Sequence, residues 1–235
     1  MRFQKPLLRV KLLRRYKRFL ADVYSKEMDL TFTVHCPNSG SMKGIYENDP
    51  EPTAWISPAE NAQRQLPYTL EMIETSYGMV GVNTQNPNKI AVEAIQGGKI
   101  DALLYYESLK REVRYDENSR IDILLTSPDK PVTYVEVKNV SMRVDDHLCF
   151  PDAVTSRGTK HLLGLMRMVD EGHRAVMFYI SQRSDCTTFT VAKDIDPLYA
   201  ETLMKAIDHG VEVLAYGCHV TPEEIRLKDK LKIRL

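Results

Sequence analysis

The sequence predicts two domains: a small β-barrel in the first third of the chain, followed by an α/β domain built on a mixed sheet. In residues 1–84, short strand-like segments alternate with turns, and no convincing helix appears. From residue 85 onward, strand, helix, strand, helix and strand patterns follow one another, which is the order of an α/β layer. A charged hairpin at residues 119–142 adds a candidate site to the second domain.

The first strand of the predicted barrel is strongly basic. Residues 2–18 contain eight basic side chains and no acidic one, and apolar and basic residues alternate around Val10. The alternation changes phase at Leu12-Leu13 and again at Arg14-Arg15, which predicts a long curved strand with a bulge. Together with strands expected over 31–36, 54–56 and 69–76, this pattern predicts a barrel of the OB type.

The basic residues of this strand are candidates for contact with a nucleic-acid backbone, because cations interleaved with aromatic side chains suit such a surface. A solvated strand face that protects a sheet edge explains the same residues equally well. The candidate residues are Arg9, Lys11, Arg14, Arg15, Lys17 and Arg18.

The predicted second domain extends over residues 85–235. Asn88 is the expected N-cap of a short helix over 89–95 that stops at Gly97-Gly98. Thr155 or Ser156 is expected to cap a second helix that runs to about residue 171, and a third helix is expected over 197–209. Strands are expected over 175–181, 189–192 and 211–216.

The hairpin at 119–142 organises this domain. If it is symmetric about Asp129, paired residue numbers sum to 258, so that Asp122 lies opposite Glu136 and Arg120 lies opposite Lys138. Directly paired side chains have Cβ atoms roughly 4.5–5.5 Å apart, and like charges placed there are destabilising. A compensating cation is therefore expected.

Two interpretations of this charged cluster remain open. Asp122 and Glu136 suit Mg²⁺ or Mn²⁺, which bind through one or two carboxylates plus substrate phosphate, and Lys138 would orient water or stabilise the phosphorane. The pattern then predicts phosphodiester hydrolysis. Alternatively, the four side chains form a structural ion-pair cluster.

Two further groups of charged residues could serve the same site. Glu93 is either a third acid aimed at the hairpin or a solvated side chain. Arg157, Lys160 and His161 share one face near the start of the second helix, where they either face an anion or form a solvated basic surface.

Composition narrows the class of protein. The chain has 235 residues, 32 basic against 32 acidic side chains, and 43% hydrophobic content, so any affinity for nucleic acid must come from local patches. No apolar run reaches the length of a membrane span, and no secretory signal is visible. The four cysteines are widely spaced, which is typical of reduced thiols. We therefore expect a cytoplasmic location without membrane contact.

The arrangement of Asp122 with Glu136-Val137-Lys138 resembles the catalytic core of the restriction-endonuclease-like, PD-(D/E)XK fold. Longer strings along the whole chain closely resemble the sugar fermentation stimulation protein A family. These strings are RYKRFLADV (15–23), HCPNSG (35–40), VNT (82–84), SRIDILL (119–125), YVEVKNVS (134–141), FPDAVTSRGTKHL (150–162) and VEVLAY (211–216).

This resemblance implies an N-terminal OB-like domain, a nuclease-like domain, non-specific DNA binding and a regulatory role in bacterial sugar or maltose metabolism. It gives Asp122, Glu136 and Lys138 the nuclease triad and gives Glu93 the acidic position on the preceding helix. The basic positions on the following helix fall to Arg157, Lys160 and His161, and Gly164 stands where relatives often carry an acid. A DNA-binding regulator without catalysis and a protein-interaction module are the alternatives.

Overall fold

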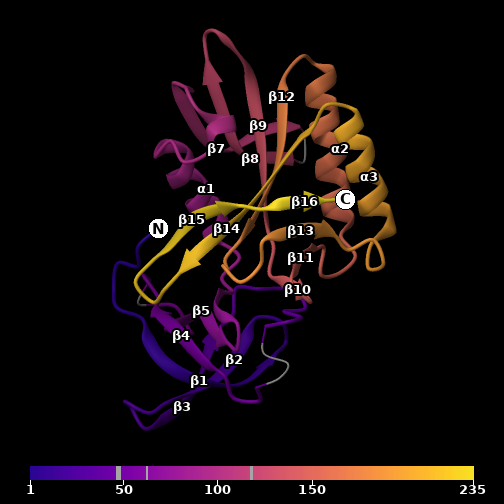
Figure 1. Ribbon diagram of the computed structural model, residues 1–235. Helices are drawn as coiled ribbons and strands as arrows, with labels where there is room; N and C mark the ends of the chain where they lie inside the picture. Colours follow the sequence, from indigo (N-terminus) through magenta and orange to yellow (C-terminus); the bar gives the residue numbers. More distant parts are fainter. Residues whose placement is uncertain (46–48, 62, 117–118) are drawn as a thin grey trace.

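The computed structural model describes residues 1–45, 49–61, 63–116 and 119–235. Figure 1 shows a barrel at the bottom and a larger body of sheets and helices above it, with α2 and α3 side by side along one flank. In the part of the chain that is described, no helix is long and apolar enough to cross a membrane.

The barrel is built by the first 81 residues and confirms the predicted OB architecture. Its strands pair in the order β3-β2-β1-β4-β5-β6, and a parallel contact between His35 of β3 and Thr69 of β5 closes the sheet. The register of β1 shifts between Leu12 and Arg14, so the predicted bulge is present. The strands are β1 (Leu8–Tyr16), β2 (Leu20–Ser25), β3 (Leu30–His35), β4 (Thr53–Pro58), β5 (Tyr68–Thr75) and β6 (Gly78–Gly81).

The second body is organised by a six-stranded sheet in the order β15-β14-β12-β9-β8-β7. Strands β9, β12 and β14 are parallel and central, whereas β7, β8 and β15 are antiparallel to their neighbours. The central β12 is buried along almost its whole length, as its continuous apolar run predicts. The strands are β7 (Ser108–Asp116), β8 (Ser119–Ser127), β9 (Lys130–Asn139), β12 (Arg174–Ser181), β14 (Glu212–Val220) and β15 (Ile225–Lys230).

Helices cover both faces of this sheet. Helix α1 (Asn86–Gln96) packs Ile90, Ala94 and Ile95 onto one face. Helices α2 (Ser156–Asp170) and α3 (Pro197–Asp208) cover the opposite face, and a short 3-10 helix, η1, spans Asp101–Leu103. The sheet therefore lies between two apolar layers, which is how a parallel sheet becomes fully buried.

A small second sheet was not predicted from the sequence. It pairs in the order β10-β11-β13-β16 and lies between the barrel and the main sheet in Figure 1. Its strands are β10 (Met142–Val144), β11 (His147–Phe150), β13 (Thr188–Val191) and β16 (Lys232–Arg234). Each has only three or four residues, too few for a periodic pattern.

The predicted start of α1 was wrong. The helix begins at Asn86 after Gln85, and Pro87 lies in its first turn, where the missing N–H of a proline costs nothing. Asn88 is therefore inside the helix and not its cap. By contrast, Thr155 does cap α2, because its hydroxyl accepts a hydrogen bond from the Gly158 N–H.

The barrel and the second body are joined by buried hydrogen bonds. The Gly81 N–H donates to the Gln182 carbonyl at 2.7 Å, and the Gln182 side-chain amide donates to the Asn83 carbonyl at 2.9 Å. Arg183, 1% exposed and held by Ser141 and Asp185 of its own body, donates to the Gly44 carbonyl of the first body at 3.5 Å. These contacts fix the barrel against the end of the main sheet.

Candidate active site

The predicted hairpin is formed by β8 and β9. Ile123 pairs with Val135, Leu124 with Tyr134 and Leu125 with Thr133, so these residue numbers sum to 258 as predicted. The register shifts between Leu125 and Ser127, and Ser127 pairs with Lys130, so the turn is not symmetric about Asp129. The recorded pairing ends at Ile123, before Asp122 and Arg120. Asp122 therefore has no paired partner in the ladder, and its side chain is free to fill the gap where the strands separate.

The Asp122 carboxylate occupies that gap. Its Oδ2 accepts a hydrogen bond from the Val137 N–H at 2.7 Å, and its Oδ1 accepts one from the Asn88 side chain at 2.8 Å. Burial raises the pKa of Asp122, and the neighbouring charge of Glu136 raises it further, while the two hydrogen bonds act in the opposite direction. The carboxylate is thus oriented from β9 and from α1 at once.

Glu136 is the most deeply buried acid of the cluster, at 3% exposure. Its Oε1 accepts a hydrogen bond from Lys138 at 2.5 Å and a second, very short one from the His161 ring of α2. Burial would raise the pKa of Glu136, but the hydrogen bond of His161 and the charge of Lys138 outweigh it, so this pKa lies below its usual value. Glu136 is therefore a buried carboxylate kept ionised by its neighbours.

Both ring nitrogens of His161 contact charged side chains of the cluster. Its Nδ1 faces Glu136 Oε1, and its Nε2 lies 3.3 Å from Arg157 Nε, which can only donate. Lys138 Nζ, which can also only donate, lies 3.0 Å from the same Nδ1, so the ring is held between Glu136, Lys138 and Arg157. His161 is consequently a buried member of the carboxylate cluster and not a surface cation.

Tyr115 of β7 packs against α2 within reach of the Glu136 charge. Burial raises its pKa, and the charge of Glu136 raises it further. Its hydroxyl reaches α2 at Gly164, where a Cβ would lie 2.5 Å from the Tyr115 oxygen. The mid-helix Gly164 therefore makes room for Tyr115, which gives a physical reason for a residue that lowers helix propensity.

The carboxylate pair can offer a metal ion two protein ligands. In the described chain, no group of three or more His, Cys, Asp and Glu side chains has the geometry of a metal site. Among the same residues, Glu136 Oε2 accepts no hydrogen bond, because Lys138 and His161 both contact Oε1. Glu136 Oε2 can thus face a cation directly, and each Asp122 oxygen, which accepts one hydrogen bond, keeps a further lone pair for the same ion.

Two other predicted residues are not brought to this cluster. The Glu93 carboxylate, 59% exposed, accepts a hydrogen bond from the Met1 amino group at 2.8 Å. Arg120 is exposed and pairs with Arg114 of β7, not with Lys138. Neither contacts Asp122 or Glu136 through any recorded hydrogen bond or ion pair in the described chain.

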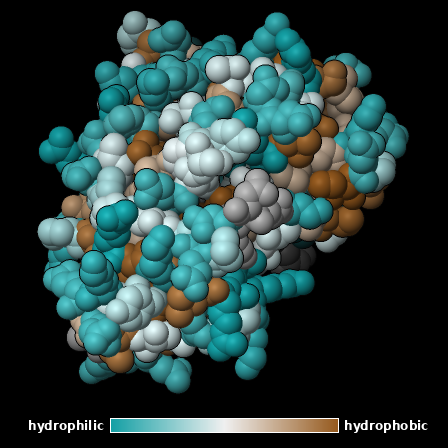
Figure 2. Space-filling model, turned by 60° about the horizontal axis from the view of Figure 1, so that its bottom comes forward, coloured by the Kyte–Doolittle hydropathy of each residue, from teal (hydrophilic) through white to brown (hydrophobic). Residues whose placement is uncertain are grey.

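The basic residues predicted on the barrel strand differ in exposure and in their hydrogen-bond partners. Arg9, Lys17 and Arg18 are exposed, and Lys11 donates to the Glu51 carbonyl. Arg14 pairs with Asp22, whereas Arg15 turns inward and donates to the carbonyls of Asn38 and Gly40. Hydrophilic side chains cover most of the barrel end (Figure 2). Arg9, Lys11, Lys17 and Arg18 can therefore contact a ligand here, and Arg14 can do so if it leaves Asp22. Arg15 instead supports the loop after β3.

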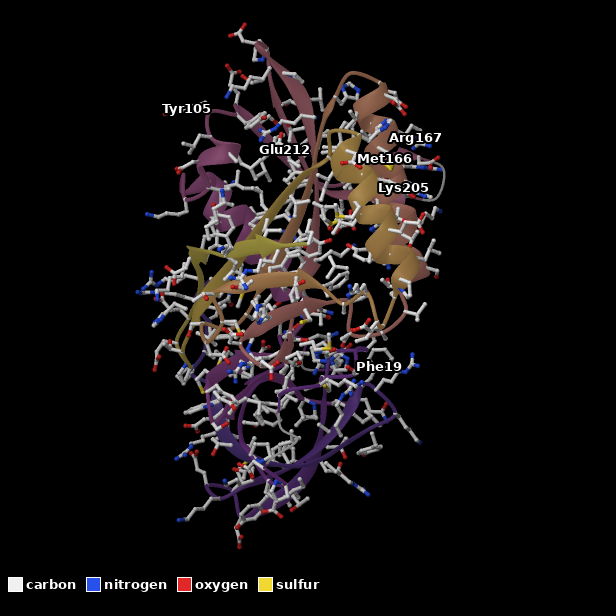
Figure 3. All side chains as sticks on the ribbon, turned by 45° about the vertical axis from the view of Figure 1, so that its right-hand side comes forward. Phe19, Tyr105, Met166, Arg167, Lys205 and Glu212 are labelled. Carbon is white, nitrogen blue, oxygen red and sulfur yellow. The ribbon has the colours of Figure 1, made fainter. Side chains whose placement is uncertain are left out.

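The turn after β1 presents two of these cations beside an aromatic ring. Lys17 and Arg18 both have positive φ, 48° and 64°, which a non-glycine residue rarely adopts. Phe19 follows and is 48% exposed. In Figure 3, Phe19 lies on the same side of the molecule as Arg167 and Lys205, the side that α2 and α3 cover. This turn thus lies on the side of the molecule that α2 and α3 cover.

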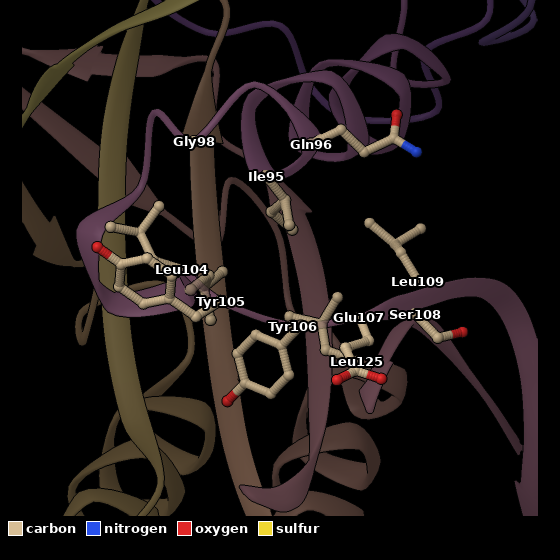
Figure 4. Close-up of a pocket in the computed structure, with 11 residues that line it drawn as sticks. Ile95, Gln96, Gly98, Leu104, Tyr105, Tyr106, Glu107, Ser108, Leu109 and Leu125 are labelled. Atoms are coloured by element: carbon tan, nitrogen blue, oxygen red, sulfur yellow. The ribbon is translucent and has the colours of Figure 1, made fainter. Parts of the chain in front are cut away.

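A separate cavity lies on another part of the molecule. It measures about 390 Å³ and is lined by apolar and tyrosine side chains from the end of α1, η1 and the start of β7 (Figure 4). Its lining includes Tyr105 and Tyr106, and Lys130 Nζ lies 5.3 and 4.9 Å from their ring centroids. None of the clustered charged residues lines it, so it is not part of the candidate site.

The two parts of the chain match two family models. Residues 13–82 match the SfsA N-terminal OB domain, and residues 85–224 match the sugar fermentation stimulation protein RE domain. A sugar fermentation stimulation protein homolog of Rhodospirillum centenum is 51% identical over 234 residues, covering 99% of each chain. The chain belongs to the sugar fermentation stimulation protein family. A homolog from Paramagnetospirillum magneticum is 47% identical and covers 100% of this chain and 98% of its own.

A solved structure of this family has the same fold. SfsA of Pyrococcus furiosus, in complex with Ca²⁺, aligns with a TM-score of 0.86 at 27% identity and covers 100% of this chain and 98% of its own. The two-domain architecture is therefore that of the sugar fermentation stimulation family.

Sequence reasoning missed Asn88, which orients Asp122, and Tyr115, which packs against α2 near Glu136. Asn88 was assigned to a helix cap, although an amide in the first turn of a helix is equally able to reach a neighbouring strand. Tyr115 carries no motif, and only the unexplained Gly164 indicated that something must approach α2 closely.

Proposed function

We propose that this protein binds DNA and hydrolyses its phosphodiester bonds with the help of Mg²⁺ or Mn²⁺. The observation that carries the proposal is the pair of the half-buried Asp122 and the buried Glu136 beside Lys138 and His161, at the point where β8 and β9 separate. Two carboxylates that repel a phosphate are costly in a purely DNA-binding surface unless a metal ion intervenes. The Ca²⁺ complex of the Pyrococcus furiosus relative supports a divalent-cation site in the family.

The residues present fit such an ion. The negative charge of Glu136 helps to raise the pKa of Asp122, so a cation between them would relieve a repulsion that already exists. When bound, a divalent ion would neutralise charge on the phosphate and lower the pKa of its water. Asp122 and Glu136 would hold it, while Asn88 and the Val137 N–H keep Asp122 in place.

The remaining side chains would act on the substrate. Lys138 Nζ, anchored on Glu136, would donate hydrogen bonds to the attacking water or to a non-bridging oxygen. His161 would keep Glu136 ionised and oriented. Arg157 and Lys160, exposed on the first turns of α2, would bind adjacent backbone phosphates. We assign no role to Glu93, whose contact is with the Met1 amino group.

The exposed cations of the barrel would extend the DNA contact beyond the site. Arg9, Lys17 and Arg18 would contribute backbone contacts, and Phe19 a stacking surface. Binding of this kind is insensitive to sequence and weakens steeply with salt. Because relatives are named for stimulation of sugar fermentation, we include a regulatory role in sugar use in the proposal.

A cleavage assay tests the proposal. End-labelled single- and double-stranded DNA would be incubated with the protein and Mg²⁺, Mn²⁺ or EDTA. We expect metal-dependent cleavage that falls at least about 100-fold in Asp122→Asn, Glu136→Gln and Lys138→Met, as removal of a single transition-state group typically causes. Asp170→Asn, which alters an exposed carboxylate of α2, is the matched control and should cleave normally.

A DNA-binding regulator without catalysis is the second candidate. One observation favours it: Lys138 and His161 already satisfy Glu136 without a metal ion. DNA retention without cleavage on every substrate, unchanged in the carboxylate variants, would support this function and contradict the enzyme.

A further inference from the structure

A large polar cavity lies where the barrel meets α1, away from the carboxylate cluster. It measures about 560 Å³ and is bounded by the N-terminal segment, the β4–β5 loop and the first turn of α1. Asn86 and Lys89 of α1 line it, whereas Asn88, on another face of the same helix, points to Asp122. Cavities of this size at a domain junction are where small ligands usually bind.

Arg64 is fixed in this cavity by the backbone of its own loop. Its Nε donates to the Leu66 carbonyl at 2.7 Å, and its Nη2 donates to the Tyr68 carbonyl at 2.9 Å and to the Thr69 hydroxyl at 2.8 Å. No carboxylate pairs with it in the described chain. The guanidinium is thus held rigidly with its Nη1 group unused, and such a group is suited to bind phosphate.

Two lysines add to the positive charge of the cavity. Lys5 and Lys89 both line it, and neither forms an ion pair with any residue that the structure describes. His35 also lines it, and its pKa is lowered first by burial and then by the positive charge of Arg64. Cations that share a cavity without direct ion pairs repel one another, and a bound anion would relieve this repulsion.

Two acidic residues also line the cavity, fewer than the three cations Arg64, Lys5 and Lys89, and neither acid forms an ion pair with these cations in the described chain. Glu71 is 5% exposed and already accepts hydrogen bonds from Ser57, Asn83 and Asn86. Glu60 is exposed at the rim. Arg64, Lys5 and Lys89 therefore remain available to a ligand.

We propose that this cavity binds the phosphate group of a small phosphate monoester, with Arg64 as the anchor and Lys5 and Lys89 as supporting charges. The site is independent of the proposed nuclease chemistry, and no carboxylate of the active-site cluster takes part. A nucleic-acid backbone carries the same chemical group and is the other possible source of the phosphate.

Calorimetric titration of the full chain tests this site without any cleavage. The probes are inorganic phosphate, adenosine 5′-monophosphate, adenosine and a short single-stranded oligonucleotide, in EDTA. We expect the monophosphate to bind and adenosine not to bind. Arg64→Gln should weaken binding at least tenfold and Lys89→Gln several-fold, while Arg226→Gln, an exposed cation on β15, should change nothing.

Two controls keep the outcome interpretable. Lys89→Gln alters an exposed side chain, so it tests the site even if Arg64→Gln unfolds the β4–β5 loop. Binding of the oligonucleotide alone, lost in Arg64→Gln, would identify backbone phosphate as the source. The site would be overturned if neither phosphate, nor the monophosphate, nor the oligonucleotide bound, or if all variants bound them equally. Neither result would bear on DNA cleavage, which belongs to the other site.

Discussion

Asn88 is the side chain through which α1 acts on the candidate site. Its amide donates to Asp122 at 2.8 Å and touches neither Glu136 nor Lys138 through a recorded hydrogen bond. Partners that orient a metal ligand typically contribute 10–100-fold to metal affinity or activity. We therefore expect Asn88→Ala to need roughly 10-fold more Mg²⁺ for half-maximal cleavage while its stability changes little. An unchanged Mg²⁺ dependence would show that Asn88 is only structural.

Asp22 predicts a pH dependence of stability in the barrel. The Thr33 hydroxyl donates to its carboxylate at 2.7 Å, and this contact, with those of Arg14 and Tyr16, lowers its pKa despite some burial. Because the folded pKa is below the unfolded one, the stabilisation is present above about pH 4 and is lost as the pH falls through the folded pKa. Asp22→Asn should lower the free energy of unfolding at pH 7 by on the order of 1 kcal/mol.

Urea unfolding at several pH values measures this effect. The difference between wild type and Asp22→Asn should be constant from pH 6 to 7 and shrink below about pH 4. A difference that stays the same down to pH 3 would mean that the Asp22 charge is not involved.

Residue-level prediction succeeded where the spacing alone decides the outcome. The three pairs from Ile123 to Leu125 have the predicted register, although the turn itself is shifted and pairs Ser127 with Lys130. The Glu136 charge acts on Asp122, so the two acids lie near one another. His161 was expected among surface cations, but it is 8% exposed and bonded to Glu136. Sequence spacing places it on a helix face, and only the packing of α2 on β9 decides that this face is buried.

At the scale of elements, α2 contains a glycine, Gly164, at the position where Tyr115 approaches the helix most closely. Gly164→Ala would raise helix propensity by about 1 kcal/mol, but its Cβ would lie 2.5 Å from the Tyr115 hydroxyl oxygen. We expect Gly164→Ala alone not to stabilise the protein. In a Tyr115→Phe background the same change should add about 1 kcal/mol to the free energy of unfolding.

Chemical denaturation of the four proteins of this cycle measures the coupling. Equal effects of Gly164→Ala with and without the Tyr115 hydroxyl would contradict the contact.

The elements that were predicted are those with long periodic patterns. The α2 and α3 helices and the β12 strand each have eight or more residues, and their bounds were predicted within a few positions. The strands β10, β11, β13 and β16 were missed, except for an expected segment near β13. Their pairing joins residues as distant in sequence as Thr188 and Lys232, and no local sequence pattern predicts such a pairing.

At the scale of the whole molecule, the junction between the two bodies depends on glycine. Gly44 has a φ of +71°, and a Cβ there would lie 2.6 Å from the Arg143 carbonyl oxygen of the second body. Gly78 has a φ of +123° with no atom near its missing Cβ. Gly44→Ala should therefore destabilise the protein by about 1–3 kcal/mol more than Gly78→Ala.

Thermal unfolding of both alanine variants measures the difference. Gly78→Ala introduces backbone strain alone, whereas Gly44→Ala introduces strain and a clash at the contact between the two bodies. A Gly44→Ala variant as stable as Gly78→Ala would show that the junction tolerates separation. The two-body division itself was expected from the sequence, but its contacts were not, because they link residues more than 90 positions apart, such as Gly81 and Gln182.

The central claim is that Asp122 and Glu136 form a divalent-metal site, and titration with Mn²⁺ followed by electron paramagnetic resonance tests it most directly. We predict one bound Mn²⁺ per chain in the wild type and in Asp170→Asn, and at least tenfold weaker binding in Asp122→Asn and in Glu136→Gln. Equal Mn²⁺ binding by all four proteins, or none by the wild type, would contradict the account and leave the carboxylates as a structural ion-pair cluster.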